Sequence, residues 1–200
     1  MSLGGDGTFL KTASMIKNRQ MPILGVNTDP QRSVGCLCNR KVFHATCDDD
    51  IHKMMRYIER ENFEFFNRQR LLFEMENEMT GVSHRQYSLN EIFVAEENVS
   101  QTSVFRLNVD GEFLGKFKSS GLIIATGTGS TGWLYSAKRF TEIDVKRALA
   151  NLGAHDEPEA VARHISMTLS DQTIFDPSSD SMYYYVREGC RSKGDFVDHA

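Results

Sequence analysis

Apolar residues recur along this chain with two different periods. In the first 61 residues the spacing is helical, most clearly in the set Ile51, Met54, Met55 and Ile58, whose methionines we expect to lie in a core. From about Asn62 apolar and charged residues alternate, and a period of two is typical of half-buried strands. The pattern predicts an α/β domain over residues 1–61. It also predicts an antiparallel β-sheet or β-sandwich domain with helical insertions over residues 62–200.

The same pattern predicts the individual elements. A helix is expected around Phe9 and a short buried strand at 22–27. Further strands are expected over 89–95, 104–109, 112–118, 122–125 and 182–187, with Asp110-Gly111 as a hairpin turn. Residues 76–87 are polar and contain Gly81, so we expect an exposed connection there. Two helices are expected at about 142–152 and 157–164.

Two stretches combine glycine with groups that bind ligands. The first, Gly4-Gly5-Asp6-Gly7-Thr8, runs into the first helix and would present successive N–H groups to an anion such as phosphate. A carboxylate beside phosphate is repelled unless it contacts a cation or accepts a proton. Asp6 is therefore a candidate for metal contact or for a general base, and the alternative is a turn residue favoured between glycines.

The second stretch is the run Thr126-Gly127-Thr128-Gly129-Ser130-Thr131-Gly132, which follows an apolar strand. Glycine lets a ligand approach the backbone closely, and the hydroxyl groups supply donors and acceptors for phosphate or ribose. A flexible glycine-rich loop is the alternative, and for this run taken alone it is favoured.

Composition limits the class of protein and its partners. The 200 residues carry 23 Lys and Arg against 27 Asp and Glu, a net charge of −4, which indicates neither a nucleic-acid nor a membrane partner. No apolar run reaches the length of a membrane span. The four cysteines lack the paired spacing of a zinc site. Their scatter along the chain is typical of reduced thiols in an intracellular compartment.

The start of the sequence looks incomplete for such a fold. Only Met1, Ser2 and Leu3 precede the first glycine-rich stretch, too few for the buried strand that normally leads into a phosphate loop. We therefore expect the α/β domain to be partial, with upstream elements and any targeting peptide missing.

With these motifs in order, the sequence resembles the NAD kinases. The family carries a Gly-Gly-Asp-Gly-Thr motif, a later Asn-Glu or Asn-Asp pair and a Thr-x-Thr-Gly-Ser-Thr loop, which stand here at 4–8, at Asn90-Glu91 and at 126–131. Residues 25–30 and 118–121 resemble the mitochondrial type, whereas Gly127 replaces a proline common in bacterial relatives. The resemblance implies transfer of the ATP γ-phosphoryl group to the 2′-hydroxyl of the NAD adenosine ribose, with Mg²⁺. It also implies a homodimer, and a mitochondrial matrix location or otherwise a cytoplasmic one. The family continues with further strands after the one that 182–187 resembles, so the resemblance implies that the sheet domain lacks its last strands.

The resemblance also implies a role for each motif residue. Asp6 would be the catalytic base, and Gly4, Gly5, Gly7 and Thr8 would bind the ATP phosphates. No side chain is assigned as a metal ligand, and Trp133 would either stack on a nucleotide or close the core. The residues expected to bind NAD are Asn90, Glu91, Ser120, Thr126, Thr128, Gly129, Ser130, Thr131, Gly132 and Trp133.

Two other functions remain open at this point. A lipid kinase of the diacylglycerol or sphingosine type shares the first loop and a two-domain layout. A shortened, non-catalytic form that binds NAD or pairs with a full-length subunit is the second alternative.

Overall fold

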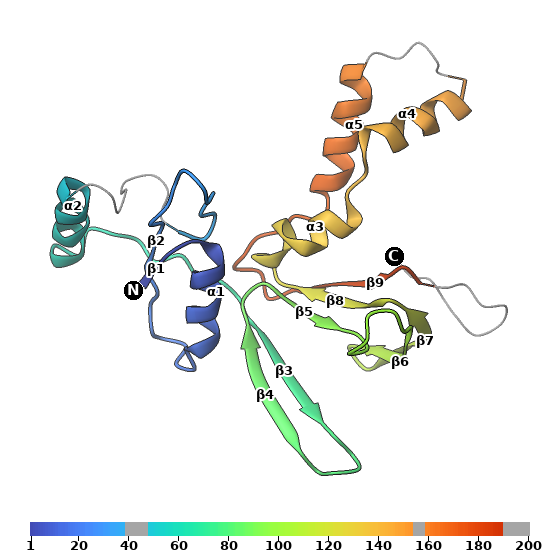
Figure 1. Ribbon diagram of the computed structural model, residues 1–200, viewed down its shortest axis with the longest axis horizontal. Coiled ribbons are helices and arrows are strands. Elements are labelled where there is room, and N and C mark those ends of the chain that lie inside the picture. Colours follow the sequence, from blue (N-terminus) through green and yellow to red (C-terminus); the bar gives the residue numbers. More distant parts are fainter. Residues whose placement is uncertain (39–47, 154–158, 190–200) are drawn as a thin grey trace. The chain divides into compact units, whose positions relative to one another are not determined.

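A computed structural model describes residues 1–38, 48–153 and 159–189 of the chain (Figure 1). The contacts between residues divide it into two units, Met1–Leu89 and Asn90–Ala200, and each is described by itself. The predicted domain boundary at 61/62 marks the change of period in the sequence. The contact division falls later in the chain because the hairpin that follows packs on the first helix.

Unit 1 begins with a pair of short parallel strands. Strand β1 (Ser2–Leu3) pairs with β2 (Gly25–Val26), and helix α1 (Asp6–Met15) lies between them in the chain. We expected the three residues before Gly4 to be too few for a buried strand. They form a strand of only two residues, in which Leu3 is 60% exposed, and the Ser2 N–H donates to the carbonyl of Leu24. The core of this unit is the cluster Phe9, Ala13 and Leu89, with Leu10, Ile23 and Leu37 packed against it.

Helix α2 (Asp48–Glu59) has the predicted helical spacing but buries little of it. Met54 is 5% exposed, whereas Met55 is 42% exposed and Ile51 and Ile58 are each 37% exposed. The prediction that both methionines are core residues is therefore correct for Met54 and wrong for Met55.

An antiparallel hairpin completes unit 1. Strand β3 (Leu71–Glu76) pairs with β4 (Ser83–Ser88), so that Leu71 faces Ser88 and Glu76 faces Ser83. We expected residues 76–87 to be an exposed connection. They are largely exposed, but residues 83–88 form a strand because their backbone pairs with β3.

Arg70 ties this hairpin to helix α1. Its guanidinium donates to the carbonyls of Ala13 and Ile16 at the end of α1 and lies 4.7 Å from the ring centre of Tyr87 on β4. A cation at this position also interacts favourably with the helix dipole. One side chain therefore fixes the orientation of the helix that begins at Asp6.

Unit 2 contains two antiparallel sheets. Strands β5 (Glu91–Val94), β8 (Gly121–Ala125) and β9 (Tyr183–Arg187) form one sheet in the order β5-β8-β9, and β6 (Ser103–Val109) and β7 (Glu112–Ser119) form a hairpin through Asp110-Gly111. The positions of these strands agree with the predicted ranges to within two residues at each end. The core is the cluster Ile123, Ala125 and Leu134, against which Phe93, Ala137, Tyr183 and Tyr185 pack.

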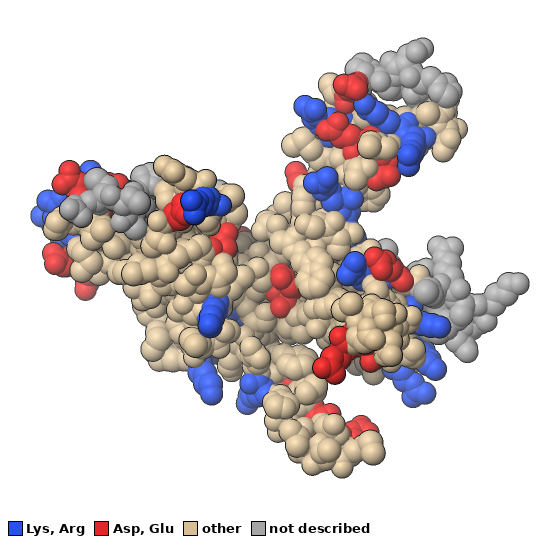
Figure 2. Space-filling model, in the orientation of Figure 1, with Lys and Arg blue, Asp and Glu red and all other residues tan. Residues whose placement is uncertain are grey.

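Helices join β8 to β9. A short 3₁₀ turn η1 (Gly129–Thr131) leads into α3 (Trp133–Lys138), which is followed by α4 (Glu142–Asn151) and α5 (Glu159–Asp171). Thr141 begins α4 with a capping box to Asp144. Ion pairs Lys146–Glu159 and Arg163–Glu142 join α4 to α5, and charges of both signs are intermixed over these helices in Figure 2. Among the described residues no helix is both long and apolar enough to cross a bilayer.

Removal of the Arg70 guanidinium should loosen helix α1. We expect Arg70→Met to lower the free energy of unfolding by about 1–3 kcal/mol, because hydrogen bonds from a charged donor contribute roughly that much. Urea denaturation measures the loss, and hydrogen exchange should show it in the amides of α1. Arg19→Met, at an exposed position, is the matched control and should change stability by less than about 0.5 kcal/mol. Equal effects of the two substitutions would contradict the assignment.

Candidate functional site

The first glycine-rich stretch is a tight turn between β1 and α1. Gly4 has a φ of 143°, which favours glycine, and its N–H donates to the carbonyl of Val26 at 3.0 Å. A Cβ at Gly4 would lie 2.5 Å from the hydroxyl oxygen of Thr8. Gly5 caps α1 without a side-chain bond, and its carbonyl accepts the N–H groups of Thr8 and Phe9. The loop therefore leads directly into a helix N-terminus, as its sequence predicts.

Asp6 is held by the backbone of Cys36 and Leu37, in the segment that follows β2. Its Oδ2 accepts the N–H of Cys36 at 2.9 Å, and its Oδ1 accepts the N–H of Leu37 at 2.7 Å. The thiol of Cys38 donates to the carbonyl of Gly4 at 3.4 Å, and burial, together with the charge of Asp6, raises the pKa of that thiol. Because these contacts use backbone donors, no side-chain pattern in the sequence indicates them.

The carboxylate of Asp6 retains capacity for a further partner. A carboxylate has about four acceptor positions, and the two backbone N–H groups fill two of them. Arg68 lies within electrostatic range: burial lowers the pKa of its guanidinium, and the negative charge of Asp6 opposes that shift. Asp6 therefore combines a fixed orientation with oxygen lone pairs that can still accept a hydrogen bond.

The second glycine-rich stretch is wound into unit 2 rather than exposed. The N–H and hydroxyl of Thr126 both donate to the carbonyl of Asn90, at 2.9 and 3.1 Å, and the Thr126 hydroxyl accepts the N–H of Gly129. Thr126, Thr128 and Ser130 are each at most 5% exposed. The alternative of a flexible loop, favoured by the run alone, is wrong, because its polar groups bond to the protein itself.

Two glycines of this loop are required by close approach of other backbone. A Cβ at Gly129 would lie 2.2 Å from the carbonyl oxygen of Asn90, and one at Gly127 would lie 2.1 Å from the carbonyl oxygen of Asp176. Neither separation is possible for a real side chain. These glycines therefore let the loop pack against β5 on one side and against the segment before β9 on the other.

Asn90 and Glu91 bring polar side-chain atoms close to Gly132, at the end of the glycine-rich loop. The side-chain oxygen Oδ1 of Asn90 is buried and accepts no hydrogen bond from any residue that the structure describes. A Cβ built at Gly132 would lie 3.6 Å from Oε2 of Glu91 and 3.9 Å from Nδ2 of Asn90. Burial raises the pKa of the Glu91 carboxyl. A buried acceptor beside a glycine suits a ligand that donates a hydrogen bond.

Ser130 and Ser120 direct their hydrogens into the protein. The Ser130 hydroxyl donates to the carbonyl of Gly127 at 2.7 Å and accepts the N–H of Phe175 at 3.3 Å. The N–H and the hydroxyl of Ser120 both point to the carbonyl of Arg187, at 3.1 and 3.2 Å. The Ser130 side chain therefore holds the glycine-rich loop against the segment before β9, and the Ser120 side chain holds the start of β8 against the end of β9.

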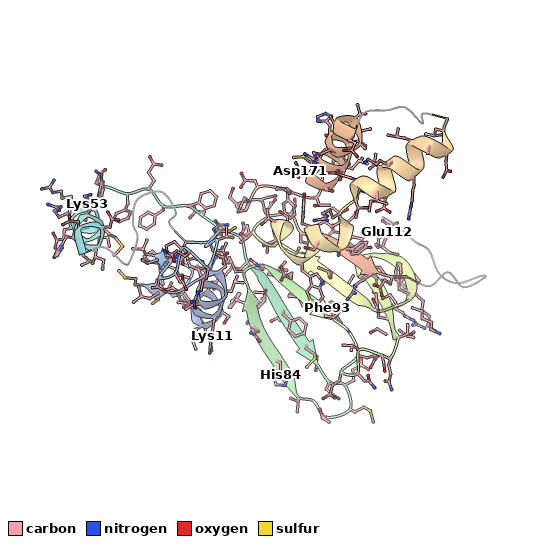
Figure 3. The ribbon with its side chains drawn as sticks, turned by 45° about the horizontal axis from the view of Figure 1, so that its top comes forward. Lys11, Lys53, His84, Phe93, Glu112 and Asp171 are labelled. Atoms are coloured by element: carbon pink, nitrogen blue, oxygen red, sulfur yellow. The ribbon has the colours of Figure 1, made fainter. Side chains whose placement is uncertain are left out.

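Trp133 lies at the start of α3 and has one covered and one open side. Its ring centre is 4.6 Å from that of Phe93 on β5, and the residue is 39% exposed. Figure 3 shows Phe93 on the strand beneath this helix. Thr131, which precedes it by two residues, is exposed and bonds to the carbonyl of Thr128 at 3.4 Å. The two roles expected for Trp133 were closing the core and stacking on a nucleotide. The ring packs on Phe93 on one side and remains accessible on the other.

Apart from Ser120, which lies at the other end of β8 against Arg187, the predicted residues form two groups, one in each unit. In unit 1 the stretch 4–8 lies against residues 36–38. In unit 2 the pair Asn90-Glu91 lies against the stretch 126–132. Within the described ranges no three His, Cys, Asp or Glu side chains gather to hold a metal ion.

Family models match both groups. The model described as the ATP-NAD kinase N-terminal domain matches residues 1–30, and that described as the ATP-NAD kinase C-terminal domain matches residues 89–139.

Among curated relatives, "NAD kinase 2, mitochondrial" of Homo sapiens is 26% identical over 94% of this chain and 51% of the relative. The protein of the same name from Xenopus tropicalis is 26% identical over 94% and 56%, respectively. The NAD kinase of Desulfatibacillum aliphaticivorans is 33% identical over 68% of this chain and 44% of the relative. The chain spans about half the length of these relatives.

Solved structures of similar fold carry nucleotides. Yeast NADH kinase complexed with NADH aligns with a TM-score of 0.53 and 27% identity over 68% of this chain and 37% of that one. The NAD kinase of Archaeoglobus fulgidus in complex with ATP aligns with a TM-score of 0.53 and 22% identity over 98% and 58%. The second likeness shows the fold alone. The fold is that of an N-terminal domain fragment followed by a β-rich C-terminal domain.

Replacement of Gly129 should test the packing of the loop on Asn90. We expect Gly129→Ala to lower the free energy of unfolding by about 1–3 kcal/mol, the usual effect of overpacking a well-filled site. Thermal unfolding measures it. Gly7→Ala is the matched control, because a Cβ there meets nothing within 4 Å, and it should leave the melting temperature within about 2 °C. A tolerated Gly129→Ala would contradict the close approach.

The raised pKa of Glu91 predicts a dependence of stability on pH. In the window above the ordinary value of 4.5 the folded protein holds the Glu91 proton more tightly than the unfolded chain does. The free energy of unfolding should therefore fall as the pH rises through that window, and Glu91→Gln should flatten the fall. Urea denaturation between pH 4 and pH 7 measures both slopes. The exposed Glu97→Gln should keep the slope of the wild type, and an unchanged slope in Glu91→Gln would refute the linkage.

Proposed function

The chain belongs to the NAD kinase family, and from this premise we propose that it binds NAD and ATP and transfers the γ-phosphoryl group of ATP to the 2′-hydroxyl of the NAD adenosine ribose. The product would be NADP. The observation that carries the proposal is the pair Asn90 and Glu91 beside Gly132, where the buried Oδ1 of Asn90 has no donor among the described residues. We assign these three residues to a candidate adenosine recess.

Adenosine supplies the groups that this recess lacks. The Asn90 Oδ1 would accept a hydrogen bond from the adenine amino group or from a ribose hydroxyl, and the carboxylate of Glu91 would hold ribose hydroxyls. Thr131, Gly132 and the open side of Trp133 would line the adenosine, with the indole available for stacking. Four other members of the predicted set, Thr126, Thr128, Gly129 and Ser130, would shape the recess from behind, whereas Ser120 lies at the opposite end of β8.

The loop Gly4–Thr8 suits the phosphates of ATP. The helix N-terminus after Gly5 presents N–H groups without a side-chain cap, and anions bind favourably at such ends. Thr8 is exposed and adds a hydroxyl donor. Mg²⁺ bound to the phosphates would neutralise charge as it builds up during transfer.

Asp6 would orient the attacking hydroxyl and take its proton. The 2′-oxygen forms a bond to the γ-phosphorus while the bond from that phosphorus to the β–γ bridging oxygen breaks, so ADP leaves with the electron pair. The proton of the 2′-hydroxyl passes to the Asp6 carboxylate and then to solvent. The backbone bonds from Cys36 and Leu37 would hold the carboxylate in position during this step.

The remaining parts of the proposal follow from the relatives. Curated relatives with the word "mitochondrial" in their names support a location in the mitochondrial matrix. Assembly as a homodimer is proposed from the resemblance to the family alone.

One observation favours a second candidate function. Both oxygens of Asp6 bond to backbone N–H groups, as a turn-fixing carboxylate would. NAD binding without phosphoryl transfer is therefore the function to be distinguished from catalysis.

A single comparison separates the two candidates. We expect Asp6→Asn to lower the rate of NADP formation from NAD and ATP–Mg²⁺ by about 10²- to 10⁴-fold, because an amide cannot accept the proton. NAD affinity, measured by calorimetry, should stay within about threefold of wild type, since Asp6 does not belong to the adenosine recess. Asp180→Asn, in an exposed loop, should leave both unchanged.

The outcomes are distinct. A wild-type chain that binds NAD but forms no NADP favours the second candidate. A chain that neither binds NAD nor turns it over refutes both candidates, and phosphorylation of diacylglycerol or sphingosine in the same assay would favour the lipid-kinase alternative.

A further inference from the structure

Helix α3 lies across the three-stranded sheet of unit 2. The strand register places Phe93 on β5, Ile123 on β8 and Tyr185 on β9 in one row, so their side chains share a face of the sheet. Leu134 of α3 is fully buried against this face. A helix of six residues is about 9 Å long, and three neighbouring strands span roughly 9.5 Å. The helix is therefore long enough to reach from one edge strand to the other.

The two ends of α3 contact the two edge strands. At the start of the helix, Trp133 packs on Phe93 of β5 with ring centres 4.6 Å apart. At the end of the helix, the ammonium group of Lys138 donates to the hydroxyl of Tyr183 on β9. The same ammonium lies 4.7 Å from the ring centre of Tyr183 and 5.6 Å from that of Tyr185. A cation at such distances is attracted to the face of an aromatic ring. Both edges of the sheet therefore hold the helix.

The contact of Lys138 differs from that of an ordinary surface lysine. Lysine is usually exposed, yet Lys138 is half-buried, whereas Arg139, the next residue, is exposed. None of the ion pairs between described residues includes Lys138. Because ordering a lysine side chain costs rotamer entropy, the contact must offset that cost. Two tyrosines of β9, rather than a carboxylate, hold this ammonium group.

The rest of α3 leaves its orientation to the two ends. The helix is shorter than two turns and has no side-chain cap at its start, and so short a helix is not stable by itself in water. Leu134 is the one buried residue of this fully described helix, and a single anchor permits rotation about it. On the outer side, Tyr135 donates to Asp171 over a long 3.4 Å in an exposed position. The contact of Lys138 is therefore the one that fixes the end of α3 on the sheet.

We propose that Lys138 is a positioning residue for Trp133. By holding the end of α3 on β9, its ammonium group sets the position of the helix start, keeps the indole on Phe93 and leaves the other side of the indole open. Through Trp133, Lys138 supports the adenosine recess beside Glu91, and this consequence rests on the proposed function. The ammonium itself touches no part of the recess.

Three variants provide the test. Lys138→Met removes the ammonium group and keeps an unbranched side chain, whereas Lys138→Arg keeps a cation that can both donate and stack. Arg139→Met removes the same charge at the neighbouring exposed position and is the matched control. Circular dichroism and thermal unfolding of each full chain would check that it is folded at the temperature of the measurements.

The first measurement needs no nucleotide. Trp133 is the only tryptophan of the chain, so the emission above 300 nm on excitation near 295 nm reports on this residue alone. We expect Lys138→Met to shift the emission to longer wavelength and to raise quenching by acrylamide about twofold, because the indole loses its contact with Phe93. Lys138→Arg and Arg139→Met should match the wild type.

The second measurement is the affinity for NAD. We expect the Kd for NAD, measured by calorimetry, to rise about tenfold in Lys138→Met and to stay within about threefold in Lys138→Arg and Arg139→Met. In turnover assays the KM for NAD should rise, whereas kcat at saturating NAD and the KM for ATP should stay near the wild-type values. A loss of stability alone would not divide the kinetic constants in this way.

The outcomes that overturn the proposal are specific. One is a folded Lys138→Met with the Trp133 emission and quenching of Arg139→Met, and another is altered emission with unchanged NAD affinity. If Lys138→Met does not fold, Tyr183→Phe, which removes only the hydroxyl acceptor, is compared with Tyr184→Phe on the opposite face of β9. Equal emission from these two would also overturn it. A wild type that binds no NAD refutes the proposed function, whereas the emission of the free variants still decides the role of Lys138.

Discussion

The carbonyl oxygen of Asn90 is the point on which the candidate adenosine recess depends. It accepts the N–H and the hydroxyl of Thr126, and it lies so close to Gly129 that no side chain fits between them. These contacts fold the glycine-rich run back onto the start of β5. They also leave the Asn90 side chain with a buried oxygen that no residue described by the structure satisfies. The backbone carbonyl of Asn90 thus holds the glycine-rich loop in place, and the side chain of the same residue supplies an acceptor for a ligand.

In unit 1 the glycine-rich loop is held by a different kind of group. There a carboxylate, rather than a carbonyl, is the acceptor, because Asp6 accepts two backbone N–H groups from a turn about 30 residues further along the chain. The charge that would be placed beside phosphate is thereby partly compensated before any ligand arrives. Helix α1 carries this carboxylate at its start, and Arg70 holds the same helix at its end. Both ends of one short helix are therefore fixed by charged side chains.

The sequence predicted the elements and motifs better than it predicted their surroundings. The alternating strands and the turn at Asp110-Gly111 were identified from period and turn chemistry, which are local properties. Strand β4 was missed because its exposed residues alternate in no hydrophobic pattern, and its identity comes from pairing with β3. The exposure of Met55 and the burial of Thr126 to Ser130 were missed for a related reason. Both depend on which segment packs nearby, and helical spacing or a run of glycines does not specify that segment.

The contact between Gly127 and Asp176 restricts how this chain can change in evolution. The carbonyl of Asp176 occupies the space that any side chain at position 127 would need. The proline that bacterial relatives commonly carry at this place in the loop is therefore closed to this chain as a single step. The segment between α5 and β9 would have to move first, so the two regions must change together. Transplanting the glycine loop alone into another member of the family would leave behind the backbone that it was shaped to meet.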